Sequence, residues 1–361
     1  MLVKMQPTTP AHNSLWHKDF VMLALAGMMM SVSACMLLMM VPLQISHDVT
    51  KHPDLGLQLV FATSAYFVGL FSLGPLCSWL VQHYRRGAVC VWALVGYTAC
   101  ALLTYFLFCY AMPCTFFIAV ALRFFTGAFY GLVGMVLFST LIVDKTESKF
   151  RTQANHSAAW FARIGLALGP MLSIVISRNY AQETICFVAF CFAVLATLLV
   201  ILVKIPFKTP DDDVSCLSLD RFIMPQAIGL IVVTAAVFAC FGYVLVQVPS
   251  ALFYVLLLIG FLWTLISEHF SQFGGASQRN LFVSVVFVVA AMAAFLSPDE
   301  LLSYNLVPCI LGAGLGMAGS QSLLLLIEKS QHCRRGTAVS SFFLACEGGV
   351  ALGTIIAVCL F

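Results

Sequence analysis

The sequence predicts an all-helical polytopic membrane protein whose helices form two bundles, and three observations support that prediction. Of its 361 residues, 61% are hydrophobic and only 9% are charged, with a mean hydropathy of +1.01. Soluble domains carry about 25% charged residues. The apolar residues lie in long runs, and the basic residues gather in alternate connections between them. The chain also contains an internal repeat. A lipid bilayer is the solvent that suits such a chain.

Eleven apolar segments are long enough to cross a membrane, which takes about 20 residues. The first is longer than the apolar core of a cleavable signal peptide, and no small-residue cleavage site follows it. The expected spans are residues 20–45, 57–81, 87–110, 113–143, 155–177, 184–204, 222–247, 250–267, 281–297, 301–327 and 337–361.

Fourteen of the 18 Lys and Arg residues lie in the N-terminal tail or in the connections on its side of the membrane. The opposite connections contain only Lys51 and Arg178. This asymmetry predicts a cytoplasmic N-terminus. The net charge of +3 is not gathered into one patch, so we expect no nucleic-acid partner.

The 14 cysteines are scattered, mostly inside apolar runs, and form no C-x-x-C motif. We interpret them as small apolar packing residues and expect neither a metal site nor a cofactor. Cys109 and Cys114, on either side of one short loop, are the one pair to test as a disulfide. Three aspartates at 211–213 fit a solvated linker better than a metal site.

Three segments recur in order along the chain. Residues 74–84 (GPLCSWLVQHY) align with 260–270 (GFLWTLISEHF), and 127–134 (GAFYGLVG) with 312–319 (GAGLGMAG). Residues 151–169 (RTQANHSAAWFARIGLALG) align with 335–353 (RGTAVSSFFLACEGGVALG). The nearly constant offset predicts duplicated halves with the same orientation in the membrane.

The repeat divides the chain into a six-helix N-terminal bundle (1–204), a cytoplasmic linker (205–221) and a five-helix C-terminal bundle (222–361). The sixth span has no counterpart, because the end of the chain corresponds to the end of the fifth. A twelfth span is therefore expected to be missing, either because the chain is truncated or because the protein works with eleven.

Three motifs resemble those of the major facilitator superfamily, over residues 18 to 361. They are Gly74 with Arg85 and Arg86 after the second span, Arg123-x-x-x-Gly127-x-x-x-Gly131 in the fourth, and Gly165-x-x-x-Gly169-Pro170 in the fifth. The second resembles the motif of proton-coupled transporters, and the third that of antiporters. The resemblance implies a two-bundle facilitator fold and secondary transport of the bacterial drug/proton antiporter kind.

The resemblance has two departures. Ser78 stands where the loop motif of the family has an acid, which puts a charge-relay gate in that loop in doubt. Ser173 and Ile174 replace the last two glycines of the antiporter motif. Antiport is therefore favoured rather than established by the sequence.

Three charged residues lie inside the expected spans, where charge is costly: Arg123, Arg163 and Glu347. Glu347 is the only carboxylate we place in a span interior. A transport function would make the arginines contacts for substrate and Glu347 the carrier of a coupling proton. Buried ion pairs, or caps on backbone carbonyls, are the structural alternative. Arg163 and Glu347 occupy equivalent positions in the repeat, with opposite charge.

Neutral polar residues in the spans either line a cavity or bond helices together: Ser31, Ser33, Tyr66, Asn305 and Gln321. A further set is expected to serve helix packing or gating: Gly74, Arg85, Arg86, Gly127, Gly131, Gly165, Gly169, Pro170, Gly312 and Gly316. Pro170 removes a backbone hydrogen bond, and either a hinge or a static kink follows from that.

We expect proton-driven export of a small organic solute by a monomer in a bacterial inner (plasma) membrane, with solute, protons and lipid as partners. Symport of an organic anion or sugar, and a transport-inactive sensor or assembly factor, remain alternatives. No nucleophile–base motif or phosphate-binding loop occurs in the sequence, so we do not expect an enzyme.

Overall fold

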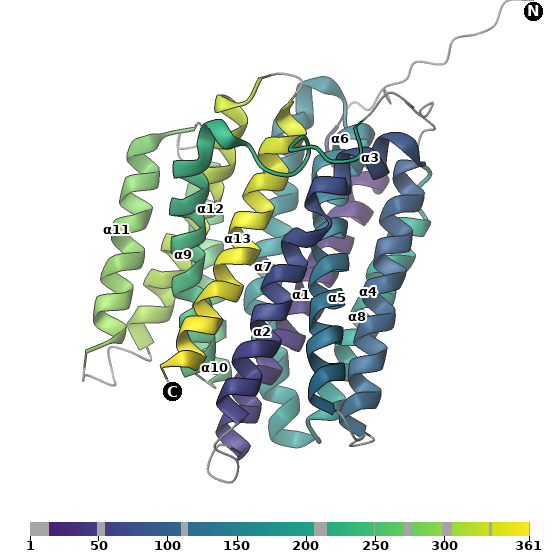
Figure 1. The fold of residues 1–361 in the computed structure, drawn as a ribbon. Coiled ribbons are helices and arrows are strands. Elements are labelled where there is room, and N and C mark those ends of the chain that lie inside the picture. The colour runs from purple at the N-terminus through teal and green to yellow at the C-terminus, as the bar shows by residue number, and fades with distance from the viewer. Residues whose placement is uncertain are drawn as a thin grey trace, which may run out of the picture.

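The computed structural model of the protein describes residues 14–48, 55–109, 115–205, 215–248, 250–270, 276–297, 305–331 and 334–360. All regular secondary structure in these ranges is helical (Figure 1). The helices are α1 (Lys18–Asp48), α2 (Leu55–Ser72), α3 (Gly74–His83), α4 (Arg86–Cys109), α5 (Thr115–Val136), α6 (Ile142–Lys145), α7 (Arg151–Asn179), α8 (Glu183–Ile201), α9 (Ile228–Gln247), α10 (Ala251–Phe270), α11 (Gln278–Phe295), α12 (Val307–Lys329) and α13 (Arg335–Cys359).

Ten helices in the described ranges are long and apolar enough to cross a membrane. The pair α2 and α3, bent by 40°, brings the number to as many as eleven when taken as one broken span. The bend falls at Pro75, which lies in the first turn of α3 and has no N–H to donate. The all-helical polytopic fold is confirmed, and each expected span overlaps one or more helices.

The fourth expected span consists of three helical pieces. A π-helical turn, η1 (Leu137–Leu141), joins α5 to α6, and all five of its side chains are buried. Such π-bulges are frequent at functional sites. The fifth span, α7, continues through Pro170 without ending, so the proline does not break the helix.

The helices pack in two sets that follow the repeat. Helix α1 lies against α7, and α9 lies in the same way against α13; α2 packs on α5, and α10 on α12. The two sets meet where α2 contacts α13 and where α7 contacts α10. Figure 1 shows α9 to α13 on one side of the molecule and α2, α4, α5 and α8 on the other.

Glycines bring these helices together. A Cβ on Gly127 would lie 2.2 Å from the Tyr66 carbonyl oxygen of α2, and one on Gly312 would lie 2.2 Å from the Leu257 carbonyl oxygen of α10. Only a residue without a side chain allows this backbone approach. Other close approaches between helices include those of Gly131 to α2, Gly165 and Gly169 to α1, and Gly349 and Gly353 to α9.

The predicted boundaries at residues 204 and 221 stay predictions, since residues 206–214 lie outside the described ranges. The three aspartates lie in that gap, as does Cys114 in another. Cys109 is exposed, and its pairing with Cys114 stays a prediction.

Candidate functional site

A cavity of about 30 Å³ lies between the two sets of helices. Arg163 of α7 and Glu347 of α13 both line it, so the structure brings together the two charges that are equivalent in the repeat. Most of its wall is apolar; the aromatic part consists of Phe138, Phe342 and Phe343. We call this the central cavity.

Arg163 is 3% exposed and has contacts on both sides of the interface. Its Nε donates to the Ala159 carbonyl at 3.1 Å, and one terminal nitrogen donates to the Gly316 carbonyl of α12 at 2.7 Å. Its guanidinium lies 4.0 Å from the ring centroid of Trp160, close enough for a cation–π interaction. The other terminal nitrogen is buried and has no hydrogen-bond partner in the described part of the chain. This terminal nitrogen of Arg163 is therefore available to donate a hydrogen bond to a ligand in the central cavity.

Glu347 is 7% exposed, and its hydrogen-bonding neighbour is the Tyr130 hydroxyl of α5. The Glu347 carboxylate and the Arg163 guanidinium form neither an ion pair nor a hydrogen bond, although the structure describes both. The acid and the cation thus share a cavity without neutralising each other by contact.

Two serines expected to line a cavity or bond helices make hydrogen bonds around Tyr130. The Ser31 and Tyr130 hydroxyls lie 3.4 Å apart. Ser33 donates to the Ala189 carbonyl at 2.7 Å and accepts from the Tyr97 hydroxyl at 3.0 Å. Sequence reasoning missed both Tyr97 and Tyr130. The position of Tyr130 between Gly127 and Gly131 was the available signal, because those glycines fix the face that α5 presents to α2.

The remaining candidates are not among the residues that line the central cavity. Arg123 is half-buried, and Tyr66 lies within electrostatic range of both Arg123 and Glu347. Arg123 forms no hydrogen bond or ion pair with any residue that the structure describes. Gln321 accepts a hydrogen bond from the Ser277 backbone at 3.0 Å, next to the start of α11. Asn305 is exposed just before α12.

A second carboxylate, Glu268, lies nearly buried at the last residue of its candidate span, so Glu347 remains the acid expected in a span interior. The Glu268 side chain, in α10, is 9% exposed. It accepts from Trp160 Nε1 at 3.3 Å and lies 3.5 Å from His156 Nε2, which also contacts the Ser320 hydroxyl at 2.6 Å. The expected eighth span ends at residue 267, so Glu268 is not counted among the charges inside the spans.

At one end of the bundle, where α7 and α13 begin, the helices meet a short polar segment. We call this the basic end, and residues 215–224 the strap; Figure 1 shows the strap crossing beneath the start of α13. Two ion pairs join helix ends here. Arg86 forms two bonds to Asp144, at 2.6 and 2.8 Å, and Lys145 binds Asp19 at 2.6 Å. Gly74 has no room for a side chain because the Phe222 ring of the strap covers it.

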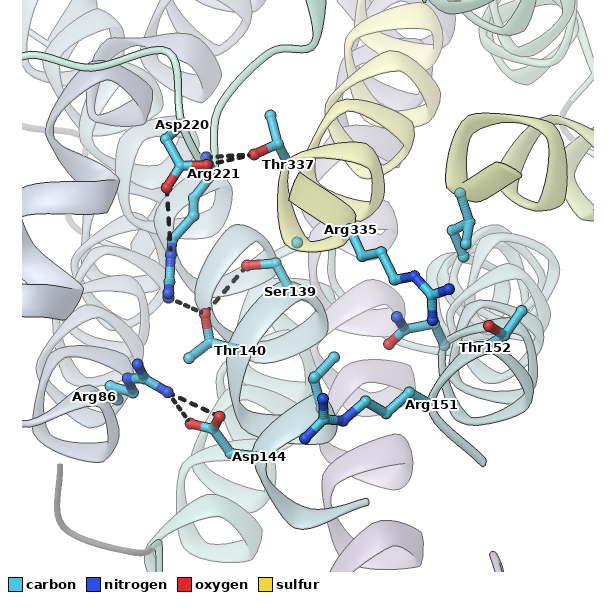
Figure 2. A pocket seen from close by; sticks show the side chains of 14 residues that line it. Arg86, Ser139, Thr140, Asp144, Arg151, Thr152, Asp220, Arg221, Arg335 and Thr337 are labelled. Carbon is cyan, nitrogen blue, oxygen red and sulfur yellow. Dashed lines mark hydrogen bonds and ion pairs between the residues drawn. The ribbon is translucent and has the colours of Figure 1, made fainter. Parts of the chain in front are cut away.

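The strap is bonded to both sets of helices. Ser218 N–H donates to the Pro75 carbonyl at 3.0 Å, and Arg221 donates from its side chain to the Thr140 hydroxyl at 3.0 Å. On the other side, Thr337 of α13 donates to Asp220 at 2.7 Å and accepts from Arg221 N–H at 2.9 Å (Figure 2).

The strap also supplies an acid where the loop motif has none. The Ser78 hydroxyl lies 3.4 Å from the Asp220 carboxylate. The backbone of Arg221 has a φ of 56°, which is uncommon for a residue with a side chain. That turn lets Asp220 and Arg221 both reach helices. No sequence pattern places residue 220 beside residue 78.

Comparisons with solved structures give the same fold at low identity. The human organic anion transporter MFSD10 matches with a TM-score of 0.69 and 14% identity, covering 95% of this chain and 93% of that one. A D-xylose–proton symporter matches with a TM-score of 0.67 and 12% identity, covering 96% and 90%. A bacterial homologue of the iron transporter ferroportin, in its outward-facing state, matches with a TM-score of 0.64 and 14% identity, covering 95% and 97%.

No curated protein matches the sequence significantly. Residues 20–354 match the sequence profile described as Major Facilitator Superfamily. The match covers nearly the whole chain and agrees with the helical architecture, and this family assignment points to a transporter rather than to an enzyme. The protein is a multi-pass membrane protein that belongs to the Major Facilitator Superfamily.

Proposed function

We propose that the protein exports a small organic solute in exchange for protons, by alternating access to the central cavity. The two bundles would rock about this cavity and open it first to one side of the membrane and then to the other. Glu347 carries the proton, and Arg163 holds the solute.

The observation that carries this proposal is the burial of Glu347 without a cationic partner. A charge inside a membrane protein is expensive unless it is paired, and protonation removes the charge. The Glu347 carboxyl lies at the interface of two bundles that would separate during transport, so each opening would bring it to water on one side. A carboxyl in that position can take up a proton on one side and release it on the other.

The placement of Arg163 supports a solute that competes with the proton. Its unpartnered terminal nitrogen is suited to an acceptor group on the solute. Because Arg163 and Glu347 line one small cavity, a solute bound to Arg163 also reaches Glu347. A donor or cation on the solute would then occupy the carboxylate that the proton needs, and this exclusion couples their opposite movements. The aromatic wall favours a solute with an apolar body.

The distribution of basic residues supports a cytoplasmic basic end, in a bacterial inner membrane with the N-terminus in the cytoplasm. In the described state the strap and the ion pairs hold that end together. The proton would then enter from the opposite side, and the solute would enter from the cytoplasm after the basic end opens. A monomer contains the whole central cavity, so we propose that it acts as one.

The test is transport by the purified full chain in proteoliposomes. A counterflow screen of radiolabelled organic solutes identifies one that exchanges, and the same solute is then followed under an imposed pH gradient. Glu347→Gln should keep counterflow and lose gradient-driven accumulation, since exchange needs no net proton movement. Glu183→Gln, at the start of α8 outside the cavity, is the matched control and should behave as wild type.

Three results would count against the proposal. A Glu347→Gln variant that concentrates solute as wild type does would exclude Glu347 as the proton carrier. Accumulation on the side to which protons flow would indicate symport in place of exchange. Binding of a partner protein with no flux of any screened solute would favour the sensor or assembly factor.

A further inference from the structure

A second and larger cavity, of about 190 Å³, lies at the basic end (Figure 2). It is lined by the strap, by η1, by the end of the fourth span and by the first turns of α7 and α13. We call it the basic cavity. The central cavity is separate from it, and Asn155 is a wall residue of both.

The basic cavity has an excess of positive charge. Four arginines and two aspartates line it, which leaves two guanidinium groups without a carboxylate. Arg86 is paired with Asp144 by two short hydrogen bonds, and Arg221 lies 3.9 Å from Asp220. The four arginines are Arg86, Arg151, Arg221 and Arg335.

Arg151 and Arg335 are the two arginines of the basic cavity that have no carboxylate partner among the described residues. Figure 2 shows both side chains extending into the region between the helices, with no interaction drawn to either. The structure gives neither an ion pair with any residue it describes, and Arg151 Nε is buried without a hydrogen-bond partner. Arginine presents a fork of donors that matches the oxygens of a phosphate group.

The helix ends add to this potential. Arg151 is the first residue of α7, a helix of 29 residues, and Arg335 is the first of α13, a helix of 25 residues. The two residues begin the aligned segments of the repeat, so the duplicated halves bring equivalent helix N-termini to one cavity. Helix N-termini carry partial positive charge and free N–H groups, which suit anions.

Asn155 gives an independent indication of a ligand site. It is 5% exposed, it lines the basic cavity, and its side-chain oxygen has no hydrogen-bond partner among the residues that the structure describes. A buried polar group left without a partner costs about 1–3 kcal/mol. The amide can present either its oxygen or its nitrogen to a ligand that has both donors and acceptors, such as a protonated phosphate.

Repulsion among the arginines of the basic cavity also favours binding of an anion there. Burial and, next, the charge of Arg86 lower the pKa of the Arg221 guanidinium, while Asp220 acts in the opposite direction. A bound anion would relieve this repulsion. The cavity has room for it, since a single water needs only about 10–15 Å³ of comparable space.

We propose that the basic cavity binds a phosphate group, held by Arg151 of one bundle and Arg335 of the other. The group comes either from free inorganic phosphate or from the headgroup of an anionic phospholipid. Since the two arginines belong to different bundles, the bound phosphate stabilises the state in which the basic end is closed.

The experiment uses the full chain, purified in detergent and stripped of phospholipid. The thermal unfolding midpoint is measured in sodium phosphate and in sodium chloride of equal ionic strength, and phosphate binding is measured by equilibrium dialysis with labelled phosphate. A separate sample is reconstituted in dioleoylphosphatidylglycerol, and the retained lipid is counted by native mass spectrometry. The variants are Arg151→Gln and Arg335→Gln, with the exposed neighbour Arg334→Gln as matched control.

Phosphate should raise the midpoint of wild type and of Arg334→Gln above the chloride value. Each of the other two variants should weaken phosphate binding at least tenfold. Phosphate binding in detergent identifies the free ion as a ligand, whereas retained phosphatidylglycerol that both variants lose identifies the lipid headgroup. The proposal is overturned if neither ligand binds wild type, or if Arg334→Gln weakens binding as much as the others. Arg151→Lys, which keeps the charge but not the fork, serves if a glutamine variant fails to fold.

Discussion

Thr337 of α13 forms two hydrogen bonds to the strap. Replacing it with valine should raise the population of the form in which the basic end is open. The valine has nearly the same shape but no hydroxyl. It removes the bond to the Asp220 carboxylate, at 2.7 Å, and the bond from Arg221 N–H, at 2.9 Å. Thr337 is 3% exposed, so water cannot replace these bonds while the end stays closed.

The two bonds have different strengths. A neutral hydrogen bond contributes about 1 kcal/mol to stability, and a bond to a charged group contributes about 1.5–3 kcal/mol. The Asp220 side chain is 41% exposed, which screens its charge, so we take about 1 kcal/mol for its bond as well. The variant should therefore favour the open form by about 2 kcal/mol, a factor of about 30 in the equilibrium constant.

Cys77 provides a native reporter of this opening. It is fully buried in α3, within electrostatic range of Asp220 and Arg221 of the strap. Its alkylation by N-ethylmaleimide can be followed at the single peptide by mass spectrometry. When opening and closing are faster than alkylation, the rate follows the population of the open form. Thr337→Val should thus raise the rate about 30-fold.

Thr337→Ser keeps the hydroxyl and should alkylate at a rate near that of wild type. Asp220→Asn weakens only one of the two bonds and should raise the rate by less than Thr337→Val does. An unchanged Cys77 rate in both Thr337→Val and Asp220→Asn, in folded protein, would refute the idea that these bonds hold the strap in place.

Two further substitutions test the packing and the central cavity. A Cβ at position 131 would lie 2.2 Å from the Leu70 carbonyl oxygen. Gly131→Val should therefore lower the free energy of unfolding by about 1–3 kcal/mol, measured as a lower unfolding midpoint. A Cβ built at Gly56 meets nothing within 4 Å, so Gly56→Val should leave the midpoint unchanged. Equal losses in the two variants would contradict the packing argument. Arg163→Lys keeps the charge but loses the fork that binds Gly316, so the half-saturating solute concentration in counterflow should rise about tenfold or more. An unchanged value would separate Arg163 from solute binding.

The fold was largely predictable because a membrane imposes a strong pattern on the sequence. Each apolar segment that hydropathy indicated overlaps a helix in the described residues, because about 20 consecutive apolar residues are typical of a membrane span. Helix ends were less predictable. The bend at Pro75 and the π-helical turn at residues 137–141 depend on how neighbouring helices satisfy local backbone groups, which no window of hydropathy contains.

The site was predictable only in part. The repeat alignment indicated that Arg163 and Glu347 occupy equivalent positions, but it could not show that they share a cavity without touching. Tyr130 and Glu268 were missed because the importance of a tyrosine or of an acid near a helix end depends on the partner opposite. The strap is the extreme case, since its partner Thr337 lies more than a hundred residues further along the chain.

The packing around Arg163 also constrains how relatives of this protein can diverge. A Cβ at Gly319 would lie 2.7 Å from a terminal nitrogen of Arg163, so even an alanine there would displace the guanidinium from its buried place. A side chain at position 319 would therefore push the guanidinium away from the place where it binds the Gly316 carbonyl, and glycine at 319 favours the observed position of Arg163. The two positions, 156 residues apart in the sequence, should therefore covary and be inherited as a pair.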